Sequence, residues 1–252
     1  MYKKLATIIM AAGQGKRMKN PDKSKVMHTL HGKPMIQYVT SLALQLNSEI
    51  IIPIVGHQKH SVMEFINSGF TENAGKIKFA HQDEQLGTGH AVMQSESILK
   101  DFEGDVLILS GDVPLLKLDT IKDFIRFHYQ NKFDASLISA NFKEPSGYGR
   151  VLRDEQNNFY EIREEKDCTE KEKQCKEINS GIYLINNKIL FNALKTLKTD
   201  NAQKEYYLTD IFKYFKKSGN AIGAFPVSNE IEITGVNSVE QLEELEKEIT
   251  LS

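Results

Sequence analysis

The sequence predicts an α/β fold, a doubly wound, Rossmann-like mixed sheet with a small antiparallel elaboration. Apolar β-branched runs alternate with amphipathic stretches along the first half of the chain, which is typical of strands and helices packed in layers. Polar or glycine-bearing loops follow several of these runs. No linker rich in Gly, Ser or Pro and no internal repeat divides the chain. We therefore expect one domain over residues 1–252.

The first half alternates strands with helices. Buried strands are predicted at residues 6–10, 49–56, 76–82, 104–112 and 133–141, where β-branched and other apolar residues cluster. Pro34 suits the start of a helix, and Met35, Val39, Leu42 and Leu46 follow it at helical spacing. Further helices are predicted at residues 89–99 and 118–129. Because the 104–112 strand is almost wholly apolar, we expect helices on both faces of the sheet.

The second half predicts the antiparallel elaboration. Residues 147–165 have the pattern of a hairpin with "EQNN" (155–158) as its turn. Strands are expected at residues 177–186, 221–227 and 232–236, and helices at residues 206–217 and 238–252, the last of them acidic and amphipathic. Strand-end loops at 11–15, 80–89 and 110–114 should converge on one pocket, because ligands bind beyond the carboxyl ends of such strands.

Composition excludes several classes of protein. The chain has 252 residues, of which 40% are hydrophobic and 26% charged, as in an ordinary folded protein. Its formal net charge of −2 provides no basic field, so we expect no nucleic-acid partner. No apolar stretch approaches a membrane span. "MYKKLATIIMAAG" resembles a secretory signal, but its removal would delete the first strand, so a cytoplasmic location is expected.

The segment "IIMAAGQGKRM" (8–18) has the features of a phosphate loop. Gly13 and Gly15 precede the basic pair Lys16 and Arg17. A Walker A spacing is absent, and the dinucleotide pattern G-x-G-x-x-G fails at Met18. Two interpretations remain open: a tight turn after a strand, or backbone N–H groups lying along a polyphosphate with Arg17 as a planar fork for its oxygens.

Other loops offer further candidates of the same kind. Asp112 stands at the end of the 104–112 strand, where it either begins a turn or supplies hard oxygen to Mg²⁺. Lys25 is either a solvated surface lysine or a second phosphate ligand. Cys168 and Cys175 lack neighbouring histidines and are interpreted as incidental thiols rather than metal ligands.

Taken together, the motifs resemble the sugar-nucleotide pyrophosphorylase family, and within it the uridylyltransferase domains that make UDP-N-acetylglucosamine, a peptidoglycan precursor. The likeness runs in order through "AAGQGKRM", "SKVMHTLHGKPM", "QDEQLGTGHAV", "SGDVPLL", "GYGRVLR", "EEKD", "EINSGIY", "NAQKEYYLTDI" and "GVNS". It implies the nucleotide-diphospho-sugar transferase fold. It also implies a reaction in which UTP and N-acetylglucosamine 1-phosphate give UDP-N-acetylglucosamine and pyrophosphate.

The resemblance also implies residue roles. Arg17 and Lys25 would stabilise phosphate charge, and Asp112 and Asn237 would ligate Mg²⁺. Nucleotide-binding residues would be Ala11, Ala12, Gly13, Gly15, Gln82, Gly87 and Thr88, and substrate-binding residues Gly111, Gly149, Glu164 and Asn179. A phosphate monoester is largely dianionic at pH 7, since its second pKa is about 6, so no general base is required. Positioning and charge neutralisation would carry the reaction.

The chain departs from the family pattern at four positions. Lys16 stands where Thr or Ser is usual, and Ser24 replaces a Pro before Lys25. Ser110 replaces an aromatic residue, and Thr234 an acidic one. These departures bear on the choice of sugar and nucleotide more than on the reaction class.

Alternative functions are a nucleotidyltransferase for another sugar 1-phosphate or nucleotide, and a non-catalytic nucleotide-sugar-binding regulator. A nicotinamide oxidoreductase is disfavoured by the missing third glycine. The bifunctional members of the resembled family carry a β-helix of hexapeptide repeats that transfers acetyl groups and forms trimers, and no such repeat occurs in this sequence. We therefore expect a stand-alone uridylyltransferase that is a monomer or weak dimer.

Overall fold

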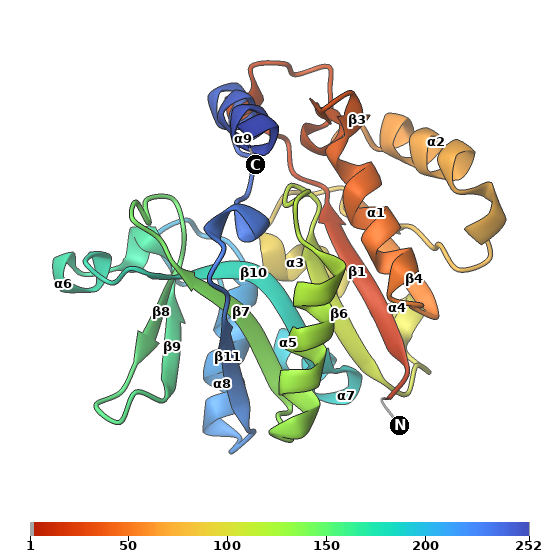
Figure 1. Cartoon of the computed structure of the whole chain (residues 1–252). Coiled ribbons are helices and arrows are strands. Elements are labelled where there is room, and N and C mark those ends of the chain that lie inside the picture. The colour runs from red at the N-terminus through yellow and green to blue at the C-terminus, as the bar shows by residue number, and fades with distance from the viewer. Residues whose placement is uncertain (1–2, 252) are drawn as a thin grey trace.

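A twisted nine-stranded sheet forms the centre of the computed structural model, which describes residues 3–251 (Figure 1). Its main path runs in the order β11-β7-β10-β6-β1-β4-β5. These strands are β1 (Leu5–Ala11), β4 (Ile50–Val55), β5 (Ala80–His81), β6 (Asp105–Ser110), β7 (Ala135–Asn141), β10 (Glu177–Asn186) and β11 (Ile222–Pro226). The order places the first strand of the chain near the middle of the sheet.

The sheet is mixed, as predicted. Strand β1 pairs in parallel with β4 and with β6, so that Ile8 lies opposite Ile52 on one side and Ile108 on the other. Strand β10 runs antiparallel between β6 and β7. The carboxyl ends of β1, β4, β5 and β6 therefore meet at one edge, and β10 enters that edge from the opposite direction.

Helices cover both faces of the sheet. One face packs against α1 (Met35–Gln45), α2 (Lys59–Gly69) and α5 (Leu118–Gln130), and the other against α3 (Thr88–Met93), α4 (Glu96–Leu99), α7 (Asn187–Leu194) and α8 (Ile211–Lys217). Side chains of β1 alternate between these layers: Ile9 faces the first, and Ile8 the second. None of the helices described within residues 3–251 combines the length and apolar character that a membrane crossing needs.

The predicted hairpin projects from the sheet beside β10 (Figure 1). It consists of β8 (Arg150–Arg153) and β9 (Phe159–Arg163), and Ile178 of β10 pairs with Arg150. The carboxylate of Asp154 accepts backbone N–H bonds from Gln156 (3.0 Å) and Asn158 (2.8 Å), which closes the turn. A short helix, α6 (Glu170–Lys173), follows the hairpin.

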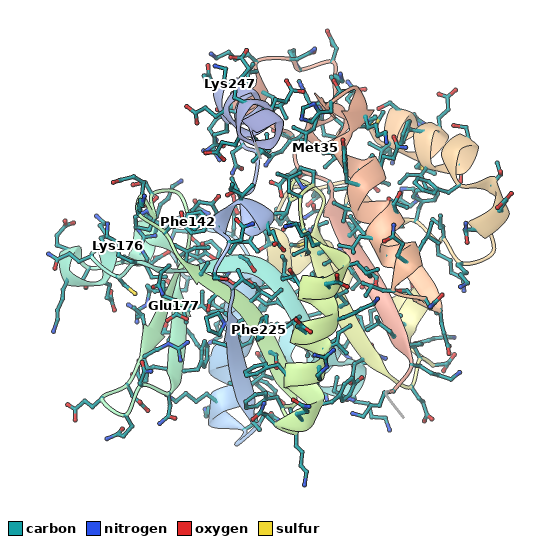
Figure 2. The ribbon with its side chains drawn as sticks, viewed as in Figure 1. Met35, Phe142, Lys176, Glu177, Phe225 and Lys247 are labelled. Atoms are coloured by element: carbon teal, nitrogen blue, oxygen red, sulfur yellow. The ribbon has the colours of Figure 1, made fainter. Side chains whose placement is uncertain are left out.

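The acidic C-terminal helix α9 (Val239–Leu251) lies over the start of α1, where Figure 2 labels Met35. A separate apolar cluster joins the two helices to β2 (Thr29–Leu30), which pairs with β3 (Lys33–Pro34). It comprises Met18, Leu30, Met35, Val236 and Leu245. Glu246 accepts the backbone N–H of His31 at 2.9 Å, and Lys19 pairs with Glu240. Helix α9 thus fixes the loops that lead into the site.

The prediction of a strand at residues 232–236 is wrong. Glu230–Ile233 form a 3-10 helix, which the Asn229 side chain caps at the N–H of Ile231. The backbone then turns inward, and the N–H of Val236 donates to the carbonyl of Asp112 at 2.9 Å. This segment is shaped by that long-range contact rather than by its β-branched residues.

Other predicted boundaries shift. The 76–82 strand is reduced to β5 and a single bridge from Ile77 to Ile51. The 89–99 helix is broken after Met93 into α3 and α4. The 206–217 helix begins only near Leu208, because the backbone of Tyr206 bonds instead to Leu86 and Gly89. Helices α2, α6 and α7 and strands β2 and β3 were not predicted.

Gly111 provides a test of how tightly the edge of the sheet is packed. A Cβ at this position would lie 2.9 Å from the carbonyl oxygen of Met10 and 3.0 Å from Val26. We expect Gly111→Ala to lower the free energy of unfolding by about 1–3 kcal/mol through overpacking, measured by urea denaturation. Gly13→Ala is the control, since no atom lies within 4 Å of its added Cβ. Equal stability of the two variants would contradict this account.

Candidate active site

Two adjoining cavities lie at the carboxyl ends of the central strands. Their volumes are about 280 Å³ and about 270 Å³. Met10, Thr88, Ser110 and Asp112 line both. The two cavities therefore form one divided cleft, with Asp112 at the division.

The first cavity gathers most of the residues predicted to bind a nucleotide. Its lining includes Ala11, Ala12, Gly13, Lys25, Gln82, Gly87 and Thr88. These residues come from the loops after β1 and β5 and from the segment after the first loop. The predicted convergence of strand-end loops is therefore present, because Ser110 and Asp112 at the end of β6 line the same cavity.

The loop around Gly87 is held by the segment that follows α7. Gly87 has φ +113°, and a Cβ there would lie 2.7 Å from the carbonyl oxygen of Tyr206. The N–H of Gly89 donates to that carbonyl (2.7 Å), and the Thr88 hydroxyl accepts the N–H of Leu208 (3.0 Å). The motifs "QLGTGHA" and "NAQKEYYLTD" thus pack directly against each other beside the first cavity.

A cation centre occupies the division between the cavities. The Lys25 ammonium contacts the carboxylate of Asp112 and donates to the amide oxygen of Asn237 at 2.8 Å. The Lys25 side chain is only 13% exposed, so it is not the solvated surface lysine of the alternative interpretation. Asp112 and Asn237 are thereby brought together from distant parts of the chain, as predicted for two ligands of one ion.

This donor set suits a divalent cation. Carboxylate and amide oxygens are hard ligands of the kind that Mg²⁺ prefers, and here both already face a positive charge. Within the described part of the chain, no group of three or more His, Cys, Asp and Glu residues could hold a metal. A cation bound between Asp112 and Asn237 would therefore need substrate oxygens or water to complete its shell.

The second cavity contains the residues predicted to bind the sugar. Gly149, Glu164 and Asn179 line it, as does the predicted metal ligand Asn237. Asn179 lies where the register of β10 shifts, and its amide donates to the Tyr183 hydroxyl at 2.7 Å. Its amide oxygen accepts the N–H of Gly181 at 3.2 Å. The irregular strand thus turns a polar side chain toward the cleft.

Glu164 is a partly buried carboxyl group that lines this second cavity. Burial raises its pKa above the usual range, a hydrogen bond from the Thr209 hydroxyl (2.9 Å) opposes the shift, and the nearby Asp210 carboxylate adds to it. The carboxylate is therefore poorly solvated in the free protein, and a ligand hydroxyl would find a strong acceptor here.

Three predicted residues do not line either cavity. A Cβ on Gly15, whose φ is +61°, would lie 2.7 Å from the Cβ of Lys25. The absence of a side chain at Gly15 therefore leaves room for the Lys25 side chain. Gly111 packs against Met10 at the edge of the sheet. Arg17 is exposed beside the cleft. Their assigned roles in binding or catalysis stay predictions.

The departures from the family pattern have different surroundings. The hydroxyl of Ser24 is buried without a hydrogen-bond partner among the described residues. Ser110 lines both cavities, and the Thr234 hydroxyl donates to the carbonyl of Glu230. The side chain of Lys16 lies outside what the structure describes.

Several lining residues were not predicted: Met10, Gln85, Tyr148, Ser180, Glu205 and Thr209. Most of them lie inside motifs that the sequence offers, such as "QDEQLGTG", "GYG" and "YYLTD". Their positions in those motifs were the available signal. Their orientation follows from contacts between loops and could not be obtained from spacing.

Comparison with known proteins agrees with this geometry. The family model described as nucleotidyl transferase matches residues 6–230. The chain belongs to the nucleotidyl transferase family. The resemblance inferred from the motifs is confirmed at this level.

Two curated relatives have the name bifunctional protein GlmU. The protein from Thermoanaerobacter pseudethanolicus is 44% identical over 243 residues, and that from Caldanaerobacter subterraneus is 45% identical over 243 residues. Each match covers 96% of this chain and 51% of the relative, so the chain spans about half the length of these proteins. A UDP-glucose pyrophosphorylase solved with UDP-glucose has the same fold, with a TM-score of 0.77 at 18% identity, covering 100% of this chain and 99% of that one.

Ser24→Pro is expected to stabilise the chain by about 1 kcal/mol. Its φ of −58° already suits proline, and the change removes a buried hydroxyl without a partner among the described residues. Chemical denaturation of wild type, Ser24→Pro and Ser24→Ala separates the two effects, since alanine removes only the hydroxyl. A loss of stability in the proline variant would show that the loop cannot accept the ring.

Glu164 should make stability fall as pH rises. Its pKa is higher in the folded than in the unfolded chain, so folding retains a proton that the unfolded chain releases above about pH 4.3. Between this pH and the raised folded pKa, Glu164→Gln should gain free energy of unfolding relative to wild type. Urea denaturation at several pH values checks the slope. Glu155 is exposed, so the free energy of unfolding of Glu155→Gln should vary with pH as that of the wild type does. If the free energy of unfolding of Glu164→Gln varied with pH in the same way, the assignment would be contradicted.

Proposed function

We propose that the chain works as a single domain that transfers a uridylyl group from UTP to N-acetylglucosamine 1-phosphate. The products are UDP-N-acetylglucosamine and pyrophosphate. The observation that carries this proposal is the divided cleft, in which a nucleotide-type cavity and a second polar cavity meet at Asp112. The GlmU relatives, matched over 96% of the chain, support the same reaction.

The two cavities suit the two substrates. Backbone of Ala11, Ala12 and Gly13 and the side chain of Gln82 would hold the nucleotide in the first cavity. The partly buried Glu164 carboxylate and the Asn179 amide would bind sugar hydroxyl and amide groups in the second. The phosphates of both substrates would then meet beside Lys25 and Asp112, where transfer needs them.

The chemistry is an in-line displacement. An oxygen of the sugar 1-phosphate forms a bond to the α-phosphorus of UTP, while the bond from that phosphorus to the leaving pyrophosphate breaks. Lys25 and Arg17 would stabilise the negative charge on the phosphates, and the cleft would hold the reacting atoms in line. The dianionic sugar phosphate needs no general base.

Mg²⁺ is the proposed metal, held by Asp112 and Asn237. When bound there, it would neutralise charge on the phosphate oxygens. Lys25 would then leave its present contacts with both ligands and turn to the phosphates. A cytoplasmic, monomeric or weakly dimeric enzyme is part of the same proposal.

Pyrophosphate release from a matrix of nucleoside triphosphates and sugar 1-phosphates tests the proposed function. We expect UTP with N-acetylglucosamine 1-phosphate to give the highest kcat/KM. Glucose 1-phosphate and galactose 1-phosphate test the sugar, and dTTP, CTP and ATP test the base. A higher kcat/KM for another pair would replace the proposed substrates, and no release with any pair would support a non-catalytic regulator.

Asp112→Asn should remove most turnover at ordinary Mg²⁺ concentrations. An amide is a weaker cation ligand, and the substitution also unpairs Lys25. Asp119→Asn is the matched control, because its carboxylate is 94% exposed at the start of α5. Binding of Mn²⁺, followed by its electron spin resonance signal, should weaken in the first variant only. Unchanged Mn²⁺ binding by Asp112→Asn would place the metal elsewhere.

A further inference from the structure

The amide of Gln82 is fixed in one orientation at the wall of the nucleotide-type cavity. Gln82 is 3% exposed, and its Nε2 donates to the carbonyl oxygen of Gly87 at 3.0 Å. A carbonyl oxygen can only accept, so the atom that faces it must be the amide nitrogen. The same Nε2 lies 3.3 Å from Nδ1 of His90. Both amide hydrogens therefore have partners when Nδ1 of His90 carries no proton.

The other end of the Gln82 amide is available to a ligand. Its Oε1 accepts no bond from a described residue, yet it is not among the buried side-chain atoms that lack a partner. Gln82 lines the first cavity. The side chain thus presents a hydrogen-bond acceptor, and not a donor, to whatever occupies that cavity.

His90 lies behind Gln82 and does not line either half of the cleft. It lines a separate groove together with Leu86, Met93 and Tyr206 among others. Its ring is tilted against that of Tyr206, with 6.3 Å between centroids. His90 therefore does not touch a nucleotide in the cleft, and its contact with the cleft lining is through Gln82.

The contact with Gln82 requires a particular form of the imidazole ring. Nδ1 must carry a lone pair to accept from Gln82, which places the proton of the neutral ring on Nε2. Gln94 approaches this second nitrogen with its own amide nitrogen at 3.2 Å and donates to the His90 carbonyl at 2.9 Å. A neutral ring has only one acceptor nitrogen, so the two glutamines compete for it. When Nδ1 is the acceptor, the bond goes to Gln82, the residue that lines the nucleotide-type cavity.

We propose that His90 is a positioning residue that sets the base preference of the cleft. By accepting from Gln82 at Nδ1, it keeps Oε1 of Gln82 directed at the base. Uracil carries an N–H donor at position 3, which matches this acceptor, whereas cytosine carries an acceptor at the same position. The inference rests on the proposed function, because it assumes that the first cavity binds the base of a pyrimidine nucleotide.

Two variants of equal size separate hydrogen bonding from packing. In His90→Asn, the side-chain oxygen stands about where Nδ1 stood and can accept from Gln82. In His90→Leu, the shape is similar and the acceptor is lost. Dissociation constants for UTP and CTP, each with Mg²⁺, are measured by calorimetry. We expect His90→Leu to lose about fivefold to tenfold of the preference for UTP, and His90→Asn to stay within about twofold of wild type.

Further measurements distinguish the ways in which the inference could fail. If both His90 variants had equally lowered melting temperatures and lost the preference for UTP equally, His90 would be a packing residue and not a positioning residue. Unchanged preference in His90→Leu would show that Gly87 alone fixes Gln82. Gln94→Leu should retain the preference, and a loss there like that of His90→Leu would overturn the assignment to His90. Failure of the proposed function would appear in the wild type, as absent UTP preference before any substitution.

Discussion

The contact of one ammonium group with two oxygen ligands organises the cleft. Lys25 contacts Asp112 and Asn237 from the first residue of a short 3-10 helix (Lys25–Met27), so three distant segments depend on its charge. Gly15 must lack a side chain for Lys25 to pass, and Val236 donates to the backbone of Asp112 beside it. Because two partly buried oxygens would be costly without a cation, the centre couples loop structure to positive charge, whether from lysine or from metal.

The mixed sheet explains how two different cavities share this centre. Parallel strands bring loops together at their carboxyl ends, and this edge provides the nucleotide-type cavity. Strand β10 is antiparallel, so its polar first half lies at this same edge. The register of β10 shifts near Asn179, and the side-chain amide of this residue lines the second cavity. Gly149 and Glu164, which flank the β8–β9 hairpin, also line this second cavity. A purely parallel sheet would supply only the first half of the cleft.

The sequence predicted the fold class, the long strands and most of the cleft, because these depend on local patterns. Strand β6 is apolar enough to be recognised alone, and the loops after β1 and β6 carry their own polar residues. Features that depend on distant partners were missed. Residues 232–236 have strand-like composition but turn inward to bond with Asp112, and Tyr206 leaves its helical pattern to pair with Leu86 and Gly89. Neither partner is visible from the segment itself.

The glycines of the motifs show why a motif locates a site more reliably than it assigns a contact. Gly87 is required because the Tyr206 backbone lies against it, Gly111 because of the Met10 carbonyl, and Gly15 because of Lys25. Gly13, by contrast, has open space where a side chain would begin. A glycine that the fold already requires gives no independent evidence of a ligand. The evidence for binding in this cleft therefore comes from side chains such as buried Gln82 and partly buried Glu164. Each keeps an oxygen acceptor that no hydrogen bond within the described fold uses.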